Sequence, residues 1–174
     1  MRVVIIRHGI AEERDDWAKS GKSDDLRPLT ADGARKVKKM ARGLLIEVPQ
    51  LAAIASSPLV RAWETARIVG EAYNARSPEA LKALAPGGDP VQVLDWINGF
   101  EGGSVALVGH EPDLGELVGW LCTGKSGTGP TLKKGGVAMV EFEAARTAST
   151  ATLKWLLYPG HLRAIGRPRP EEGA

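Results

Sequence analysis

Two arginines and two histidines of this sequence each stand where a predicted strand gives way to a loop or helix. Arg7 and His8 directly follow a run of β-branched residues at the start of the chain. His110 follows a second such run, and Arg61 stands near the start of a predicted helix. The carboxyl ends of parallel strands form the ligand-binding edge of an open sheet, so these four side chains are expected to converge there.

This combination of side chains suits a phosphoryl group. Each of two guanidinium groups can clamp two oxygens of a tetrahedral anion. Nearby cations disfavour protonation of an imidazole, so one histidine can stay neutral and nucleophilic. The other, once protonated, can donate a hydrogen bond to the phosphoryl oxygens. The set indicates covalent phosphoryl transfer through a phosphohistidine, which requires no metal.

An α/β fold is predicted to position these residues. The first strand is apolar on both faces, as in a parallel sheet that is covered by helices on both sides. Strands are predicted at residues 1–6, 51–55, 80–84, 104–109, 137–142 and 151–157. The last two are joined by a turn, which predicts an antiparallel edge.

Helix starts are predicted from capping residues. Thr30 should cap a helix that runs to about residue 48, and Asp89 is interpreted as the cap of a short helix rather than as a catalytic acid. Ser57 as N-cap with Pro58 at the first helical position would place Arg61 in the first turn. The helix dipole prefers acids at that place, so a basic residue there points to a bound anion.

Two polar regions leave alternatives open. Residues 10–29 are predicted to form a long loop that borders the site, either as a lid or as a solvated excursion. The helix that follows Thr30 carries a basic face, which is interpreted as a solvated surface, with an acidic partner as the alternative. This face consists of Arg35, Lys36, Lys38, Lys39 and Arg42.

Composition bounds the remaining possibilities. The 174 residues predict a single domain over residues 1–174, with a core at about 1–160 and a tail at 161–174. A net charge of +2 does not favour nucleic-acid binding, and no apolar run approaches a membrane span. One cysteine, Cys122, suits a reducing compartment. We expect a cytoplasmic monomer without metal or cofactor.

Three segments together resemble the histidine phosphatase superfamily, which includes phosphoglycerate mutases and acid phosphatases. They are Arg7-His8-Gly9, the Ser57-Pro58-x-x-Arg61-Ala62-x-x-Thr65-Ala66 stretch, and Val108-Gly109-His110-Glu111-Pro112. Two further stretches look most like the SixA-type phosphohistidine phosphatase branch. These are Arg27-Pro28-Leu29-Thr30-x-x-Gly33 and Leu84-Ala85-Pro86-Gly87-Gly88. The resemblance covers roughly residues 1–160.

The resemblance implies a three-layer α/β/α sandwich with a mostly parallel central sheet. It implies that His8 is the phosphorylated nucleophile and His110 the second catalytic histidine. Arg7 and Arg61 would be catalytic and bind the phosphoryl group, and the remaining substrate-binding candidates are Gly9, Arg27 and Glu111. Gly9 would let the backbone approach the ligand. The implied substrate is a phosphohistidine on a signalling protein.

One departure from the superfamily concerns the proton donor. Many members carry an acid in a Glu-containing motif between the second arginine and the second histidine, and here only Asp89 and Glu111 are candidates. The conjugate acid of an alkoxide leaving group has a pKa close to that of water, about 15.7, whereas the conjugate acid of an imidazole leaving group has a pKa of about 6.5. The missing motif therefore favours a phosphohistidine substrate and counts against a mutase.

Three other functions remain as alternatives. The first is a phosphatase of small phosphate esters or polyphosphate, with Glu111 or Asp89 as the acid. The second is a domain that binds phosphorylated proteins or nucleotides without turnover. The third, a dinucleotide-binding domain, is disfavoured because no Gly-x-Gly-x-x-Gly follows the first strand.

Overall fold

The computed structural model describes residues 1–75 and 77–167. Within them, strands assemble into one mixed sheet of order β3-β2-β4-β1-β5-β6. β3, β2, β4 and β1 run parallel, and β5 and β6 form the antiparallel edge. The strands are β1 (Arg2–Arg7), β2 (Ala53–Ser56), β3 (Glu79–Ala80), β4 (Ser104–Gly109), β5 (Val137–Phe142) and β6 (Ala151–Leu157).

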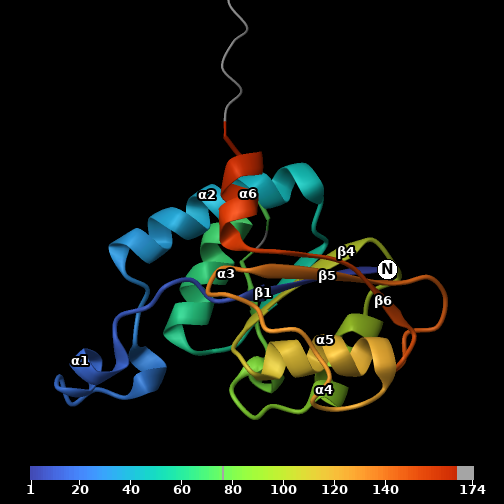
Figure 1. Cartoon of the computed structure of the whole chain (residues 1–174), viewed down its shortest axis with the longest axis horizontal. Coiled ribbons are helices and arrows are strands. Elements are labelled where there is room, and N and C mark those ends of the chain that lie inside the picture. The colour runs from blue at the N-terminus through green and yellow to red at the C-terminus, as the bar shows by residue number, and fades with distance from the viewer. Residues whose placement is uncertain (76, 168–174) are drawn as a thin grey trace, which may run out of the picture.

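Helices cover both faces of this sheet (Figure 1). α4 (Pro90–Asn98) and α5 (Asp113–Thr123) lie on one face, and α2 (Ala31–Glu47), α3 (Val60–Ala72) and α6 (Pro159–Ile165) lie on the other. The predicted three-layer α/β/α sandwich is confirmed. Helix starts behave as predicted in two cases, because Thr30 Oγ1 accepts from Gly33 N and Asp89 caps α4.

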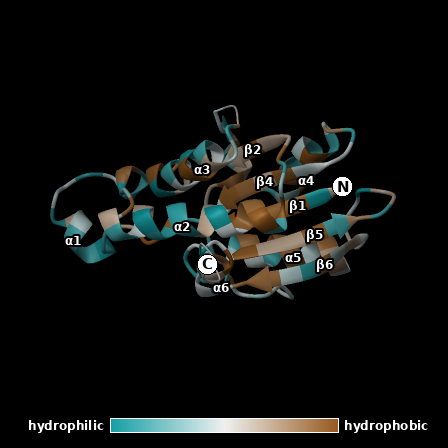
Figure 2. Ribbon diagram, turned by 90° about the horizontal axis from the view of Figure 1, so that it is seen from above, coloured by the Kyte–Doolittle hydropathy of each residue, from teal (hydrophilic) through white to brown (hydrophobic). Residues whose placement is uncertain are grey.

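The pleat of β1 explains why the chain folds into three layers. Val3 and Ile5 belong to the core cluster under α4 and α5, while Val4 and Ile6 belong to the cluster under α2 and α3. All four side chains are completely buried. Figure 2 shows β1 and β4 as hydrophobic strands in the middle of the sheet. A strand that is apolar on both faces buries all of its side chains only if helices cover both sides of the sheet.

The parallel register brings the predicted site residues to one edge. Arg7 pairs with Gly109 in the ladder, and the backbone N–H of His8 donates to the Gly109 carbonyl. On the other side of β4, Ser56 pairs with Val108. The residues that follow β1, β2 and β4 therefore leave the sheet side by side.

Three sequence-based predictions of local structure are wrong. Residues 10–29 are not a plain loop, because they contain α1 (Arg14–Ala18) and a 3₁₀ turn, η1 (Asp24–Leu26). Ser57 does not cap α3, whose N-cap position is Leu59. The edge strand predicted at 80–84 is limited to β3, which is followed by a second 3₁₀ turn, η2 (Lys82–Leu84).

The predicted tail from residue 161 is also wrong for residues 161–165. They belong to α6, whose Leu162 is fully buried against α2. Gly43 of α2 permits this contact, since a Cβ there would stand 1.9 Å from the Leu162 carbonyl oxygen. Residues 168–174 of the predicted tail lie outside the described residues.

Among the described residues, none of the helices combines the length and the apolar character needed to cross a membrane.

Candidate active site

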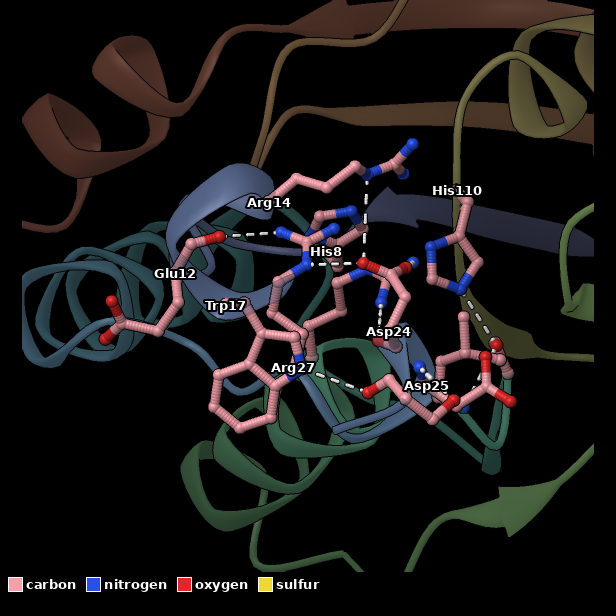
Figure 3. Close-up of polar contacts among 12 residues, drawn as sticks. His8, Glu12, Arg14, Trp17, Asp24, Asp25, Arg27 and His110 are labelled. Atoms are coloured by element: carbon pink, nitrogen blue, oxygen red, sulfur yellow. Dashed lines mark hydrogen bonds and ion pairs between the residues drawn. The ribbon is translucent and has the colours of Figure 1, made fainter. Parts of the chain in front are cut away.

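A cleft opens at the carboxyl ends of β1 and β4, and all four residues predicted to converge there line it. Its lining consists of Arg7, His8, Glu13, Arg14, Arg27, Arg61, Pro86, His110, Glu111 and Lys134. The histidines come from the ends of two adjacent strands, and Arg61 comes from the first turn of α3. Figure 3 shows His8 and His110 together with Asp24, Arg14 and Arg27.

His8 has a defined tautomer. Its Nδ1 lies 2.7 Å from the carbonyl oxygen of Gly9, which can only accept, so the proton sits on Nδ1 and the lone pair on Nε2. Burial, together with Arg61, Arg7 and Lys134, lowers the pKa of His8 to about 4, although the hydrogen bond to Gly9 opposes this shift. At neutral pH His8 is therefore an uncharged imidazole with an unprotonated Nε2.

His110 lies against His8, with ring centroids 5.1 Å apart and an interplanar angle of 54°. Its Nε2 is 2.9 Å from Ser57 Oγ, which fixes the orientation of the ring. Burial, followed by the nearby His8 and Arg61, lowers the pKa of His110 to about 3. A phosphoryl dianion in the cleft would act in the opposite direction, because it favours the charged imidazolium.

The two arginines carry buried donors that have no hydrogen-bond partner among the residues that the structure describes. The terminal nitrogens are held, since Arg7 Nη1 donates to the Leu132 carbonyl at 2.7 Å and Arg61 Nη1 donates to the Asp24 carbonyl at 2.9 Å. The Nε atoms of both are buried and unpartnered. Buried donors without partners are costly and rare, so each such atom needs an explanation. An anion bound in the cleft supplies one.

Asp24 ties the 10–29 segment to the arginines of the cleft. Its Oδ1 accepts from Arg27 Nε at 2.7 Å, and its Oδ2 is 3.2 Å from Arg61 Nη2. Arg14 Nε approaches Oδ1 at 3.7 Å. The hydrogen bond from Arg27 is the main reason that the pKa of Asp24 lies below its usual value. Figure 3 shows this carboxylate between Arg14 and Arg27.

The structure places Gly9 outside the lining of the cleft, in contrast to the prediction that its backbone approaches a ligand. Its N–H is already used, because it donates to Thr65 Oγ1 at 3.0 Å. The absence of a side chain has a packing reason instead. A Cβ at Gly9 would stand 2.5 Å from Val37 Cγ2 of α2.

The two candidate proton donors differ in position. Asp89 accepts from the Val91 N–H as the cap of α4 and does not line the cleft. Glu111 lines the cleft, but its carboxylate accepts from the backbone N–H groups of Leu132 and Gly115. Burial is the main cause that raises the pKa of Glu111. Its contacts with the backbone give it a structural role in joining the start of α5 to the loop before β5.

Sequence reasoning missed several residues of the site. Asp24 and Glu13 were part of a segment that was interpreted only as polar, and Ser57 was interpreted as a helix cap. Lys134 stands in a Gly/Ser/Lys-rich loop that offered no pattern. Only Ser57 could have been recognised as a site candidate from the sequence, because it directly follows a strand that ends beside β4.

In residues 1–75 and 77–167, no group of three or more His, Cys, Asp or Glu side chains is placed to hold a metal ion. The charged groups of the cleft are mainly cationic. The arrangement is suited to binding a tetrahedral anion next to an unprotonated imidazole nitrogen.

Comparison with known proteins agrees with this geometry. The sequence profile described as histidine phosphatase superfamily (branch 1) matches residues 3–85. An uncharacterized protein of Picosynechococcus is 34% identical over 168 residues, which cover 90% of this chain and 99% of the relative. Phosphohistidine phosphatase SixA of Escherichia coli is 32% identical over 94% of this chain and 97% of its own. A solved structure of the protein histidine phosphatase SixA complexed with tungstate has a TM-score of 0.79 and 31% identity, covering 93% of this chain and 99% of that one.

Proposed function

Because the chain belongs to the histidine phosphatase superfamily, which supports phosphatase activity, we propose that it removes the phosphoryl group from a phosphohistidine on a signalling protein. The phosphoryl group passes through a covalent phosphohistidine on His8. The observation that carries this proposal is the placement of an unprotonated His8 Nε2 in a cleft where Arg7 and Arg61 each keep a buried, unpartnered Nε.

In the first step, His8 Nε2 attacks the phosphorus of the substrate. A bond between His8 Nε2 and phosphorus forms while the bond between phosphorus and the substrate imidazole breaks. The electron pair of that bond stays on the leaving imidazole nitrogen, which takes up a proton from solvent water. Arg7 and Arg61 stabilise the charge on the equatorial phosphoryl oxygens, where preorganised donors are most effective.

In the second step, water hydrolyses the phosphoenzyme. An oxygen–phosphorus bond forms, the bond to His8 Nε2 breaks, and inorganic phosphate leaves with the protons of the water. His110, whose ring Ser57 orients, donates a hydrogen bond to the phosphoryl oxygens once the phosphate charge has raised its pKa.

The proposed substrate class follows from the carboxylates around the cleft. Asp89 stands outside the lining, and Glu111 Oε1 already accepts from the Leu132 N–H, so the proposal assigns the general-acid role to neither. An imidazole leaving group needs far less proton donation than an alkoxide. The similarity to SixA, one structure of which contains the tetrahedral oxyanion tungstate, supports the same substrate class.

The test is turnover in the presence of a chelator with three substrate classes: phosphohistidine proteins, alkyl phosphate esters and short polyphosphates. The proposal expects the highest kcat/KM for phosphohistidine. A preference for esters or polyphosphate would reassign the substrate, and binding without turnover of any of them would indicate a phospho-ligand-binding domain.

A further inference from the structure

Lys134 stands at the mouth of the cleft on a loop that is fixed to the end of β1. The N–H of Gly135 donates to the carbonyls of both Arg7 and His8, at 3.1 and 3.0 Å, and the N–H of Arg7 donates to the Gly136 carbonyl. The Lys134 side chain is exposed and makes no ion pair within the part of the chain that the structure describes. The backbone is therefore held rigidly while the ammonium group remains available.

The same lysine lines a second hollow, which adjoins the cleft and has cations on three walls. Lys36 comes from α2, Arg163 from α6 and Lys134 from the loop before β5. We call these three residues and the hollow between them the basic groove. α2 and α6 pack directly on each other through Leu162 and Gly43, so the spacing of their cations is set by the core.

The charge of the basic groove is not balanced by its own lining, which contains no carboxylate. The nearest pairing is Asp32 Oδ2 with Lys36 Nζ at 2.6 Å, and Asp32 also pairs with Arg35. Acidic side chains of the cleft lie in other elements: Glu13 at the start of α1 and Glu111 before α5. Lys36 therefore shares its charge with Asp32, whereas Lys134 and Arg163 have no ion pair among the described residues, and a substrate meets an excess of positive charge on this side of the cleft.

We propose that the basic groove receives acidic side chains next to the phosphorylated histidine of a protein substrate. This inference rests on the proposed function and adds a sequence preference to it. The floor of the groove is formed by apolar groups, among them Ile10, Val37 and Met40, which suit the methylene groups of a glutamate. A polyphosphate chain has no apolar part, so the groove fits an acidic peptide better.

The magnitude of the preference follows from exposed ion pairs. Such pairs contribute roughly 0.2–1 kcal/mol each, so two of them correspond to about a 2- to 30-fold gain in kcat/KM. The gain should disappear at about 1 M salt, where the Debye length falls to about 3 Å.

The experiment compares chemically phosphorylated histidine peptides that are identical except for two flanking residues, glutamate in one and glutamine in the other. Glutamates are placed on the N-terminal side in one pair and on the C-terminal side in a second pair. The parent enzyme should prefer one glutamate peptide by about 2- to 30-fold, and K36Q/R163Q should reduce that ratio to about 1.

Two further variants make the result specific. K38Q/K39Q removes two exposed charges of α2 that do not line the basic groove and should keep the preference. The charge reversal K36E/R163E should make the enzyme favour a lysine-flanked peptide over the glutamine peptide. This reversal is a gain that a partly unfolded variant would not show.

Each remaining outcome would contradict either the inference on the basic groove or the proposed function. Equal rates on glutamate and glutamine peptides, or a preference that survives in K36Q/R163Q, would overturn the inference and leave the proposed function in place. If K36Q/R163Q lowers only the rate on polyphosphate, the groove binds a polyphosphate chain and the inference is wrong. If no phosphohistidine peptide is hydrolysed, the proposed function itself fails.

Discussion

Ser57 Oγ lies 2.9 Å from His110 Nε2, and this contact joins the end of β2 to the end of β4. Ser57 Oγ also lies 3.3 Å from the Leu59 N–H, so the hydroxyl is held from the side of α3. His110 therefore has one ring nitrogen fixed by the protein and the other left for the cleft. The orientation of the second histidine depends on a serine 53 residues away in the sequence.

Ser57→Ala should lower kcat for the preferred phosphate substrate by about 10- to 100-fold, because a ring that has lost its orienting contact is misplaced relative to the phosphoryl group. The pH dependence of kcat should shift as well, since the hydroxyl contacts His110 directly. Steady-state kinetics across pH provide the measurement. Ser56→Ala, at a neighbouring serine that is also fully buried, is the control for packing and should leave the pH profile unchanged.

His8→Ala should abolish turnover, by at least about 1,000-fold, because His8 Nε2 is the atom that forms the bond to phosphorus in the proposed mechanism. Quenching in alkaline denaturant after reaction with a substrate carrying a radiolabelled phosphoryl group should detect a phosphoenzyme in the parent and none in the variant. Near-parental activity of His8→Ala would contradict the covalent mechanism. Binding of vanadate to the variant serves as the control that the cleft is intact.

A fall in pH should affect kcat/KM and the stability of the fold over different pH ranges. Because the pKa of His8 is lowered to about 4, the acid limb of kcat/KM should fall near pH 4 rather than near 6.5. Stability should decline earlier, from about pH 6.5 downwards. In the unfolded chain both histidines have a pKa of about 6.5, whereas in the folded chain the pKa is about 4 for His8 and about 3 for His110. Below pH 6.5 the unfolded chain therefore binds more protons than the folded chain, which lowers the free energy of unfolding.

Thermal unfolding between pH 7.5 and 4 measures the stability response. A double variant, His8→Asn with His110→Asn, should flatten the decline of Tm below pH 6.5. A decline of the same steepness in that variant would show that other groups cause it.

Asp24→Asn should separate anion binding from turnover. Loss of the carboxylate removes a negative charge beside Arg61 and Arg27, so vanadate should bind about 3- to 10-fold more tightly. The same change removes the ion pairs through which the 10–29 segment holds these arginines, and kcat should therefore fall. Asp25→Asn is the matched control, because Asp25 is its exposed neighbour and has no ion pair to the cleft among the described residues. Equal effects of the two variants would refute the role of Asp24.

The proposed mechanism, in which neither Asp89 nor Glu111 donates a proton to the leaving group, predicts a steep leaving-group dependence. The rate on phosphate esters should rise strongly as the alcohol becomes more acidic, and phosphohistidine should exceed an alkyl ester by at least about 10²–10⁴-fold, the usual contribution of a general acid. Glu111→Gln should cost less than about tenfold, and Asp89→Asn should leave the rate unchanged. A large loss in Glu111→Gln together with a flat leaving-group dependence would identify Glu111 as the acid.

The central strands and the residues at their ends could be predicted from the sequence because their patterns are local. The β-branched run before Arg7 and the run before His110 each identify a buried parallel strand, and parallel strands bring their carboxyl ends to one edge. The first-turn position of Arg61 was also correct, although α3 starts two residues later than its predicted first helical residue.

Contacts between distant segments were decided by the tertiary structure alone. Arg7 is held by the Leu132 carbonyl, 125 residues away, and Asp24 reaches Arg61 across 37 residues. The position of α6 depends on Gly43 of α2, because the lack of a side chain there lets the backbone of α6 approach closely. A periodic pattern reports which face of an element is buried, but it carries no information on which partner fills that face. The partners of Ser57, Asp24 and Lys134 follow from the register of the sheet and from close packing, which exist only once the chain has folded.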